Sequence, residues 1–528
     1  MFFDSNIWMG GSEKHLNLLL NKANRHGLIT GASGTGKTIT LKVMAEGFSA
    51  AGVPVFLADI KGDLAGMCAP GKDSEDMQGR IQSFGIDNWE YTAFPTCFWD
   101  VFGEKGLFLR ATVSDMGPML LSKLMNLTEV QEEVLNCVFK IADDNGLLLV
   151  DTKDLKAMLK YVGEHKDEFT ADYGNLTPQS LSSIQRNVVS LETLGAETFF
   201  TEPMLDINDL FRTDENGRGY INVLDSVKLG QNKTLYSTFM LWLMSELYEN
   251  LPEVGDLDKP KAVFFFDEAH LLFNDAPKVL IEKIEQVVRL IRSKGVGIYF
   301  ISQSPADVPD TILAQLGNKV QHALRAYTPK EQKAVKAAAA AFRPNPAFDT
   351  ESAITELSTG EALISFLDET GAPSVVERAK ILPPQSQMGT IDGFLRTTVT
   401  TQDALAKKYM ESVDNYTAYE KLSEVEAEAN AAKAAEAEAA AAAKLAEKEA
   451  AAAEKEAARL AKKKTGYVSS AASRVAGNTL AAAGRSAAKA AFGSSTKSVG
   501  GAVASSLLGT VGREAGKSLV RGLFGSLK

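Results

Sequence analysis

The sequence predicts an α/β fold built around a mainly parallel sheet, and two observations lead to this prediction. Residues 31–38 fit the pattern G-x-x-x-x-G-K-[ST] without a mismatch, between a short apolar segment and a stretch with helical periodicity. Residues 262–266 form a continuous apolar run that ends in two carboxylates, as in a strand buried on both faces. Open sheets of such strands bind ligands at the carboxyl ends of the strands.

The first pattern has the chemistry of a phosphate cradle. Its residues are Gly31, Ala32, Ser33, Gly34, Thr35, Gly36, Lys37 and Thr38. Glycines let backbone N–H groups come close to phosphate oxygens. We expect Lys37 to reach the terminal phosphates and Thr38 to offer its hydroxyl to Mg²⁺. Because the helix that follows adds its dipole to the anion site, the sequence predicts binding of ATP with Mg²⁺.

A second predicted strand, residues 53–59, ends in the polar string Asp59-Ile60-Lys61-Gly62-Asp63. Polar residues at the carboxyl end of a parallel strand tend to face the ligand crevice. A solvated turn is an equally good interpretation of this string. The sequence leaves both open.

The pattern changes along the chain and predicts five segments. Helical capping signals, such as Thr128 with Gln131, dominate after the second strand, and strand signals return near Gly219. The predicted segments are a first part of the core at 1–64, a mainly helical insertion at 65–218, a second part of the core with a closing hairpin at 219–400, an extended helix at 401–464 and a basic tail at 465–528.

The acidic pair after the second apolar run supplies the predicted catalytic groups. We expect Asp267 to hold Mg²⁺ through water and Glu268 to polarise the attacking water as a general base. Phosphate-transferring kinases need no base for water, so a glutamate at this position argues for hydrolysis. The alternative interpretation is that the pair caps the following helix.

Two neighbouring strings resemble other ATPase signatures but are weak. His270 completes the letters DEAH of a helicase class, yet the chain lacks that class's arginine-rich motif downstream. A histidine here is more often a packing residue or a supporting one. The string at 357–361 resembles a transporter signature, but it follows the acidic strand instead of preceding it.

Three further side chains are candidates for the reaction. Gln303 follows the predicted strand 297–302 and is placed to hydrogen-bond the γ-phosphate or the attacking water. Arg325 ends the predicted strand 320–325, where an arginine can reach the site of a neighbouring subunit. Arg292 is the other arginine candidate, and we favour Arg325 because charged residues beside an apolar helical stripe are usually only solvated.

The composition favours a protein of the cytoplasm. The chain has 528 residues, a net charge of −11 and 45% hydrophobic residues. Its three cysteines have no metal-ligand spacing and fit a reducing compartment. Neither a secretory leader nor an apolar stretch of about 20 residues is visible.

The predicted C-terminal segments differ in charge from the body. Residues 424–464 are almost entirely Ala, Glu, Lys and Arg, which predicts an exposed single helix, since Leu445 and Leu460 cannot make a coiled-coil seam. From Lys462 onward the chain carries eleven basic residues and one acid. This tail is either a flexible basic segment or an amphipathic helix for a membrane surface or a partner.

Several strings together resemble the HerA/FtsK superfamily, and more closely the bacterial HerA-like C-terminal-domain proteins. They are Asn24–Gly27, the phosphate-binding loop, Ala58–Asp63, Phe265–His270, Arg292–Gly297, Ser302–Pro305 and Gln315–His322. The resemblance covers about residues 5–400. It implies a RecA-like P-loop NTPase core of the ASCE type, a homohexameric ring and ATP-driven movement on double-stranded DNA.

Two departures from that family limit what the resemblance implies. HerA has an amino-terminal β-barrel domain that helps dock a nuclease partner, whereas about 25 residues precede the core here. HerA-type motors often carry Arg after the sensor Gln, and this chain has Ser304. The sequence therefore supports two hypotheses: an ATP-hydrolysing DNA motor, and an ATP-gated scaffold whose tail docks on a membrane or partner.

Overall fold

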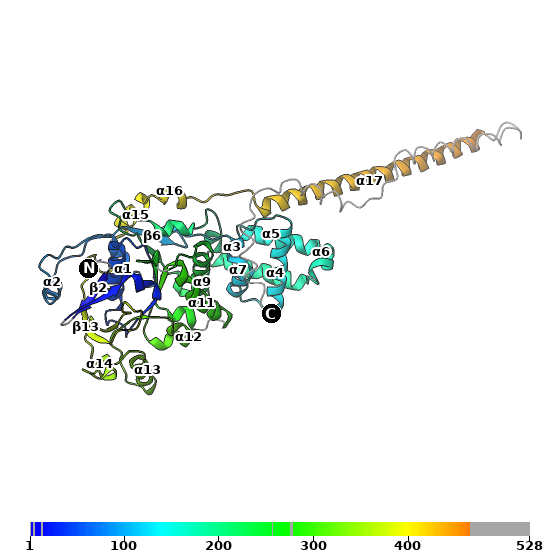
Figure 1. Cartoon of the computed structure of the whole chain (residues 1–528). Coiled ribbons are helices and arrows are strands. Elements are labelled where there is room, and N and C mark those ends of the chain that lie inside the picture. Colours follow the sequence, from blue (N-terminus) through cyan, green and yellow to red (C-terminus); the bar gives the residue numbers. More distant parts are fainter. Residues whose placement is uncertain (1, 4–5, 12–13, 256, 275–277, 465–528) are drawn as a thin grey trace.

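The computed structural model describes residues 2–3, 6–11, 14–255, 257–274 and 278–464 (Figure 1). The basic tail predicted at 465–528 lies outside these residues, and so does its predicted contact with a membrane surface or a partner. Within the described ranges, no helix has both the length and the apolar character needed to cross a membrane.

One large mixed sheet organises the protein, in the order β1-β2-β13-β12-β11-β4-β10-β9-β5-β8-β6-β7, with β3 paired to β2. The strands from β11 to β7 in this order are mutually parallel, and the remaining pairs are antiparallel. The bounds are β1 Phe2–Phe3, β2 Asn6–Gly11, β3 His15–Leu19, β4 Gly27–Thr30, β5 Val55–Asp59, β6 Thr96–Asp100, β7 Leu107–Phe108, β8 Ile221–Asp225, β9 Ala262–Phe266, β10 Val296–Ser302, β11 Asn318–Gln321, β12 Glu361–Ser365 and β13 Glu377–Ile381. The predicted closing hairpin is confirmed as the pair β12–β13.

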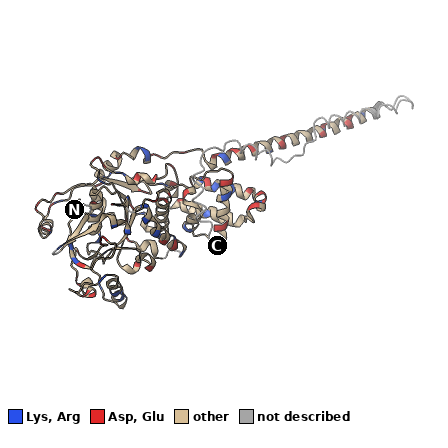
Figure 2. Ribbon diagram, in the orientation of Figure 1, with Lys and Arg blue, Asp and Glu red and all other residues tan. Residues whose placement is uncertain are grey.

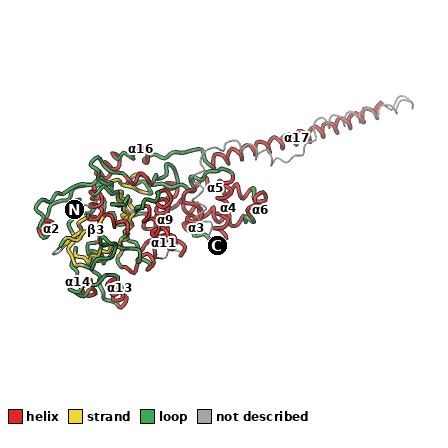
Figure 3. Tube along the Cα trace, in the orientation of Figure 1, coloured by secondary structure: helices red, strands yellow, loops and turns green. Residues whose placement is uncertain are grey.

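Helices surround this sheet, and most of those in the middle of the chain gather on one side of it (Figure 3). Their bounds are α1 Lys37–Ala50, α2 Glu75–Gln82, α3 Val113–Leu124, α4 Glu129–Asp144, α5 Thr152–Glu164, α6 Lys166–Tyr173, α7 Pro178–Thr193, α8 Ala196–Phe199, α9 Lys233–Asn250, α10 His270–Phe273, α11 Lys278–Ile291, α12 Asp310–Leu313, α13 Pro329–Ala340, α14 Thr350–Glu356, α15 Gly393–Gln402, α16 Ala406–Tyr409 and α17 Ala418–Lys464.

Strand β9 is buried on both faces, as its apolar run predicts. Phe264 and Phe266 join the core that α9, α11 and the helices α3–α7 cover. Phe265 points to the opposite core, beneath α1, where its ring packs against Tyr299 and Phe48 with centroids 5.2 and 6.3 Å apart. The α/β fold predicted from the sequence is confirmed. The central strand that ends in the acidic pair is therefore fixed from two sides.

The segment 65–218 differs from the mainly helical insertion that the sequence predicts. Helices α3–α8 occupy much of it, but β6 and β7 extend the parallel sheet beyond β8. Strand β6 is short and fully buried, and a short apolar run does not distinguish a strand from a buried helical turn. The first 25 residues likewise contribute strands to the sheet: β3 pairs with β2, and β2 pairs with β13.

The chain also leaves the globular body later than predicted. Residues 403–417 still pack against it, since the fully buried Tyr409 donates its hydroxyl to Asp209 and accepts from the backbone N–H of Asp206. Helix α17 begins at Ala418, and its first turns lie against α5. From residue 426 to 460 every α17 side chain is exposed, and the helix extends away from the body (Figures 1 and 2).

Two buried histidines make stability depend on pH. Burial lowers the pKa of His26 and of His322 to about 4. His26 accepts a hydrogen bond from the Ile298 N–H through Nδ1, which requires the neutral ring. The unfolded chain therefore binds protons that the folded chain refuses as the pH falls from about 6.5 to about 4, and the free energy of unfolding falls in this window, by on the order of 3 kcal/mol per histidine.

The variant His26→Asn isolates one of these contributions. His26 has φ of 57°, which asparagine tolerates better than most residues, and an amide oxygen can accept from Ile298. We expect the wild-type protein to lose about 3 kcal/mol more than this variant between pH 6.5 and 4, measured by chemical denaturation. Parallel pH profiles for the two proteins would contradict the assignment.

Candidate nucleotide site

Four parallel strands, in the order β4-β10-β9-β5, bring the predicted site residues to one edge of the sheet. Ser302 of β10 pairs with Thr30 of β4, Phe300 with Phe266 of β9, and Phe266 with Ala58 of β5. The phosphate-binding loop, Gln303, the acidic pair and the Asp59 string therefore all begin at the carboxyl edge. This is the edge at which open α/β sheets bind ligands.

The loop between β4 and α1 is built around its glycines. Gly31, Gly34 and Gly36 have φ values of 154°, 76° and 115°. A Cβ atom on Gly31 would lie 2.5 Å from the Cβ of His322 and 2.9 Å from the Thr35 hydroxyl. Lys37 is buried, and its ammonium donates to the carbonyls of Gly31 and Ala32 at 2.6 and 3.1 Å. The loop is therefore a tight cradle with its lysine folded back into it.

Two segments that the sequence analysis did not assign to the site hold the loop in place. His322 donates from Nδ1 to the Glu361 carbonyl at 2.9 Å, and its Nε2 accepts from Thr40 of α1 at 2.7 Å. The Gly360 N–H donates to the Thr35 carbonyl at 3.0 Å. The string 357–361, set aside as a weak transporter signature, thus lies against the phosphate-binding loop of the same chain. No local pattern could reveal this, because β11 and β12 bring both segments in.

The acidic pair lies on a strained turn directly after β9. Glu268 has φ of 48°, an uncommon value for a non-glycine residue that often marks functional sites. The Ala269 N–H donates to the Ile301 carbonyl of β10 at 2.8 Å and fixes the turn. Both carboxylates are buried. The alternative that the pair only caps the next helix does not match these contacts, because α10 has no side-chain cap.

Charged and polar groups surround the Glu268 carboxylate. Lys61 Nζ lies 2.7 Å from Glu268 Oε1 and 3.8 Å from Asp267 Oδ2. His270 Nδ1 lies 3.1 Å from Glu268 Oε2, and Gln303 Nε2 donates to the same oxygen at 3.4 Å. The structure thereby brings Gln303 and His270 to the predicted base, and adds Lys61.

The electrostatics of the site follow from burial and these contacts. Burial raises the pKa of Asp267 to about 6. Burial also acts to raise the pKa of Glu268, but the hydrogen bond and charge of Lys61 outweigh it, so this pKa lies below its ordinary value. Burial, followed by repulsion from Lys61, lowers the pKa of Lys37. The two lysines and the acidic pair are therefore close enough to shift one another's pKa at the carboxyl edge of the sheet.

These residues fit a nucleoside triphosphate with a divalent cation. At Gly31 a side chain would not fit, and the three loop glycines have positive φ, a conformation in which successive backbone N–H groups can face an anion. Oδ1 of Asp63 is buried near the acidic pair and accepts no hydrogen bond within the described residues. Thr38 lies half-buried in the first turn of α1. An unsatisfied carboxylate oxygen beside Asp267 is what a hydrated Mg²⁺ would need.

The two arginine candidates lie in different surroundings. Arg325 is exposed, four residues after β11, which pairs with β4. It is close in sequence to Ala323, whose carbonyl accepts from the Ala32 N–H of the phosphate-binding loop at 2.8 Å. Arg292 is half-buried and precedes β10, at the amino edge of the sheet, where its carbonyl lies 3.5 Å from the Asn24 amide. Only Arg325 follows its strand to the edge that carries the site.

The fold and the site together define a class, the P-loop NTPases with a parallel RecA-like core. In this core, β10 lies between the phosphate-loop strand β4 and the acidic strand β9. Within this class, the chain belongs to the family described as Helicase HerA-like C-terminal, whose model matches residues 5–528.

Individual relatives are distant. The chain is 22% identical over 377 residues to the DNA double-strand break repair helicase HerA of Sulfurisphaera tokodaii, which covers 69% of this chain and 67% of that protein. It thus spans about two thirds of the length of the HerA relatives that it matches. VirB4 of Thermoanaerobacter pseudethanolicus has a TM-score of 0.47 at 15% identity, over 72% of this chain and 97% of that one. The plasmid coupling protein TrwB with an ATP analogue has a TM-score of 0.48 at 14% identity, over 74% and 93%.

Proposed function

We propose that this protein hydrolyses ATP with Mg²⁺ and uses the reaction to move along double-stranded DNA as a homohexameric ring. One observation carries the enzymatic part. The phosphate cradle with Lys37 and a buried, hydrogen-bonded glutamate face each other across the carboxyl edge of one parallel sheet. A protein that only binds nucleotide has no need for a strained glutamate at that position.

Each residue has a defined role in this proposal. Residues 31–38 bind the phosphates, and Lys37 exchanges its two loop carbonyls for phosphate oxygens. Thr38 and Asp267 hold Mg²⁺, which when bound neutralises charge on the phosphates. Glu268 takes a proton from water, and Gln303, which already contacts its carboxylate, orients that water. Magnesium needs few protein ligands when phosphates and water complete its shell.

The ring and the DNA substrate rest on the relatives and on Arg325. Relatives at 21–22% identity are named DNA double-strand break repair helicases. Arg325 is exposed, and within the described residues no ion pair or hydrogen bond of its side chain is seen. An exposed arginine after a strand of the core is a candidate for reaching the nucleotide of a neighbouring subunit, and we assign this role to Arg325 ahead of Arg292. A nuclease partner remains part of the same proposal.

The test is ATP turnover with and without duplex DNA, together with the mass of the native assembly with and without ATP. We expect duplex DNA to stimulate turnover several-fold and ATP to favour a mass six times that of the chain. The Arg325→Ala chain is expected to assemble but to lose about 10³-fold in turnover. Absence of stimulation by any nucleic acid would contradict the motor, and a monomer under all conditions would contradict the ring.

The exposed helix α17 favours a second candidate function, an ATP-gated scaffold. Its 47 residues span about 70 Å. Its first turns lie against α5, and every side chain from residue 426 to 460 is exposed. In the sequence of this helix, acidic residues dominate the first half and basic residues the end, which matches the helix dipole. Liposome flotation of the full chain and of a chain ending at Lys464 separates the candidates: equal behaviour of the two would remove the membrane form of the scaffold. Binding that falls steeply with salt would indicate nucleic acid instead.

A further inference from the structure

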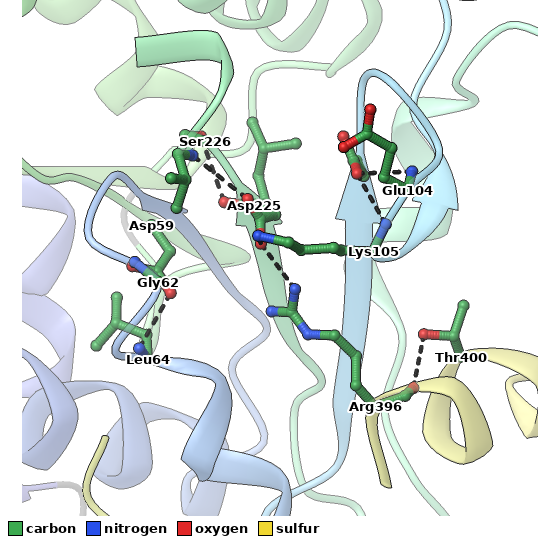
Figure 4. Close-up of polar contacts among 12 residues, drawn as sticks. Asp59, Gly62, Leu64, Glu104, Lys105, Asp225, Ser226, Arg396 and Thr400 are labelled. Carbon is green, nitrogen blue, oxygen red and sulfur yellow. Dashed lines mark hydrogen bonds and ion pairs between the residues drawn. The ribbon is translucent and has the colours of Figure 1, made fainter. Parts of the chain in front are cut away.

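The turn after β5 is held by hydrogen bonds and fixes the position of Lys61. Asp59, buried at the end of the strand, accepts hydrogen bonds from the backbone N–H groups of Gly62 at 2.7 Å and Leu64 at 3.0 Å (Figure 4). Gly62 has φ of 75°, which lets the chain reverse at this point. The sequence alone left this string open between a ligand-facing and a solvated turn. In the structure the carboxylate of Asp59 is used to shape the turn, and the side chain of Lys61 is left to project from it.

This turn places the Lys61 side chain beside Asp267 and Glu268. Because β5 and β9 are neighbours, with Ala58 opposite Phe266, residues just past each strand meet. The Lys61 ammonium lies 2.7 Å from Glu268 Oε1, yet its side chain is 42% exposed, whereas that of Glu268 is 8% exposed. Lys61 therefore connects the buried carboxylate to the solvent-exposed surface.

Both oxygens of the Glu268 carboxylate have polar contacts, and the ammonium of Lys61 is the one at Oε1. Lys61 occupies Oε1, while His270 and Gln303 share Oε2. A general base needs a lone pair directed at the water that it deprotonates. Oε1 has Lys61 as its contact, so it becomes available when Lys61 moves away. The flexible four-carbon stem and half-exposed position of Lys61 permit such a movement.

We propose that Lys61 is a positioning residue that senses the terminal phosphate: it holds Glu268 in the nucleotide-free chain and transfers its ion pair to the terminal phosphate of a bound nucleoside triphosphate, which frees Glu268 for water. This inference rests on the proposed ATP hydrolysis. The driving force is the larger negative charge of the triphosphate, which competes with the acidic pair for one ammonium. A diphosphate lacks the group that draws Lys61 away.

The experiment compares the affinities of the full chain for a slowly hydrolysed ATP analogue and for ADP, each with Mg²⁺. Lys61→Met is expected to weaken the analogue about tenfold and ADP less than about twofold, because one charge-assisted hydrogen bond is lost with the triphosphate alone. The kcat of ATP hydrolysis should fall as well. Lys61→Arg, which keeps the charge, should restore both values to within about threefold.

A matched control is Lys105→Met. Lys105 lies in the loop after β6, which is separated from β5 by β8. Its side chain is 49% exposed and pairs at 3.4 Å with Asp225, which also binds Arg396 (Figure 4). Its loss should leave both affinities unchanged. Equal weakening of the analogue and ADP by Lys61→Met, or no weakening, overturns the sensing role. A wild-type chain that binds both nucleotides without hydrolysis overturns the proposed function instead, and one that binds neither overturns both.

Discussion

Glu268→Gln is expected to lower the kcat of ATP hydrolysis by about 10²- to 10⁴-fold, with nucleotide affinity changed by less than about threefold. The substitution keeps the size of the side chain and an oxygen that can accept from Gln303 or His270. It removes the ability to take a proton, which the proposed reaction needs. Steady-state turnover and the affinity for a fluorescent nucleotide analogue measure the two quantities separately.

Two other charged residues serve as controls for this prediction, one in the phosphate-binding loop and one outside the site. Lys37→Ala should instead abolish nucleotide binding, since Lys37 is the buried cation of the cradle. Glu104→Gln should change neither quantity, because Glu104 is an exposed carboxylate that pairs with Lys228. Turnover above about a tenth of the wild-type value in Glu268→Gln would show that another group serves as the base.

The parts of the site that the sequence predicts are those encoded locally. The phosphate-binding loop needs its glycines and Lys37 within eight consecutive residues, and the acidic pair follows a continuous apolar run that is typical of a strand buried on both faces. The loop pattern and the apolar run before the acidic pair can both be recognised without knowledge of the rest of the chain. Parallel pairing then brings them to one edge, as expected for a sheet of this class.

The parts that the sequence does not predict depend on strand register. His322 reaches Thr40 because β11 pairs with β4, and Gly360 reaches Thr35 because β12 pairs with β11. The contact of Lys61 with Glu268 similarly needs β5 beside β9. In each of these contacts the two residues lie more than two hundred positions apart in the sequence. No local pattern therefore distinguishes either residue from a solvated one.

The same reasoning explains the segment after α15. Tyr409 lies in a polar stretch without helical periodicity. Its ring joins the main core beside Trp99, with centroids 5.1 Å apart, and its hydroxyl bonds to Asp206 and Asp209, about two hundred residues earlier. Arg110 adds hydrogen bonds to the carbonyls of Tyr409 and Glu411 at 3.1 Å. One buried tyrosine and a few hydrogen bonds leave no periodic apolar pattern in the sequence. A boundary judged from composition is therefore placed near residue 401, although residues 403–417 still pack against the body.

Gly31→Ala is expected to lower the free energy of unfolding of the nucleotide-free protein by about 3 kcal/mol. The added Cβ would lie 2.5 Å from the His322 Cβ and 2.9 Å from the Thr35 hydroxyl. Neither neighbour can yield easily. The His322 ring is held by Thr40 and by the Glu361 carbonyl, and the Thr35 hydroxyl donates to Ala32. A φ of 154° at Gly31 adds backbone strain for alanine.

Gly34→Ala is the matched control, because Gly34 also has positive φ, at 76°, but nothing lies within 4 Å of a Cβ built there. This variant should lose only the conformational preference of glycine, about 1 kcal/mol. Chemical denaturation of both variants without nucleotide measures the difference, which we attribute to contact between the loop and His322. Equal losses in the two variants would mean that the loop is not held by β11, and that the cradle gains its shape only when phosphate binds.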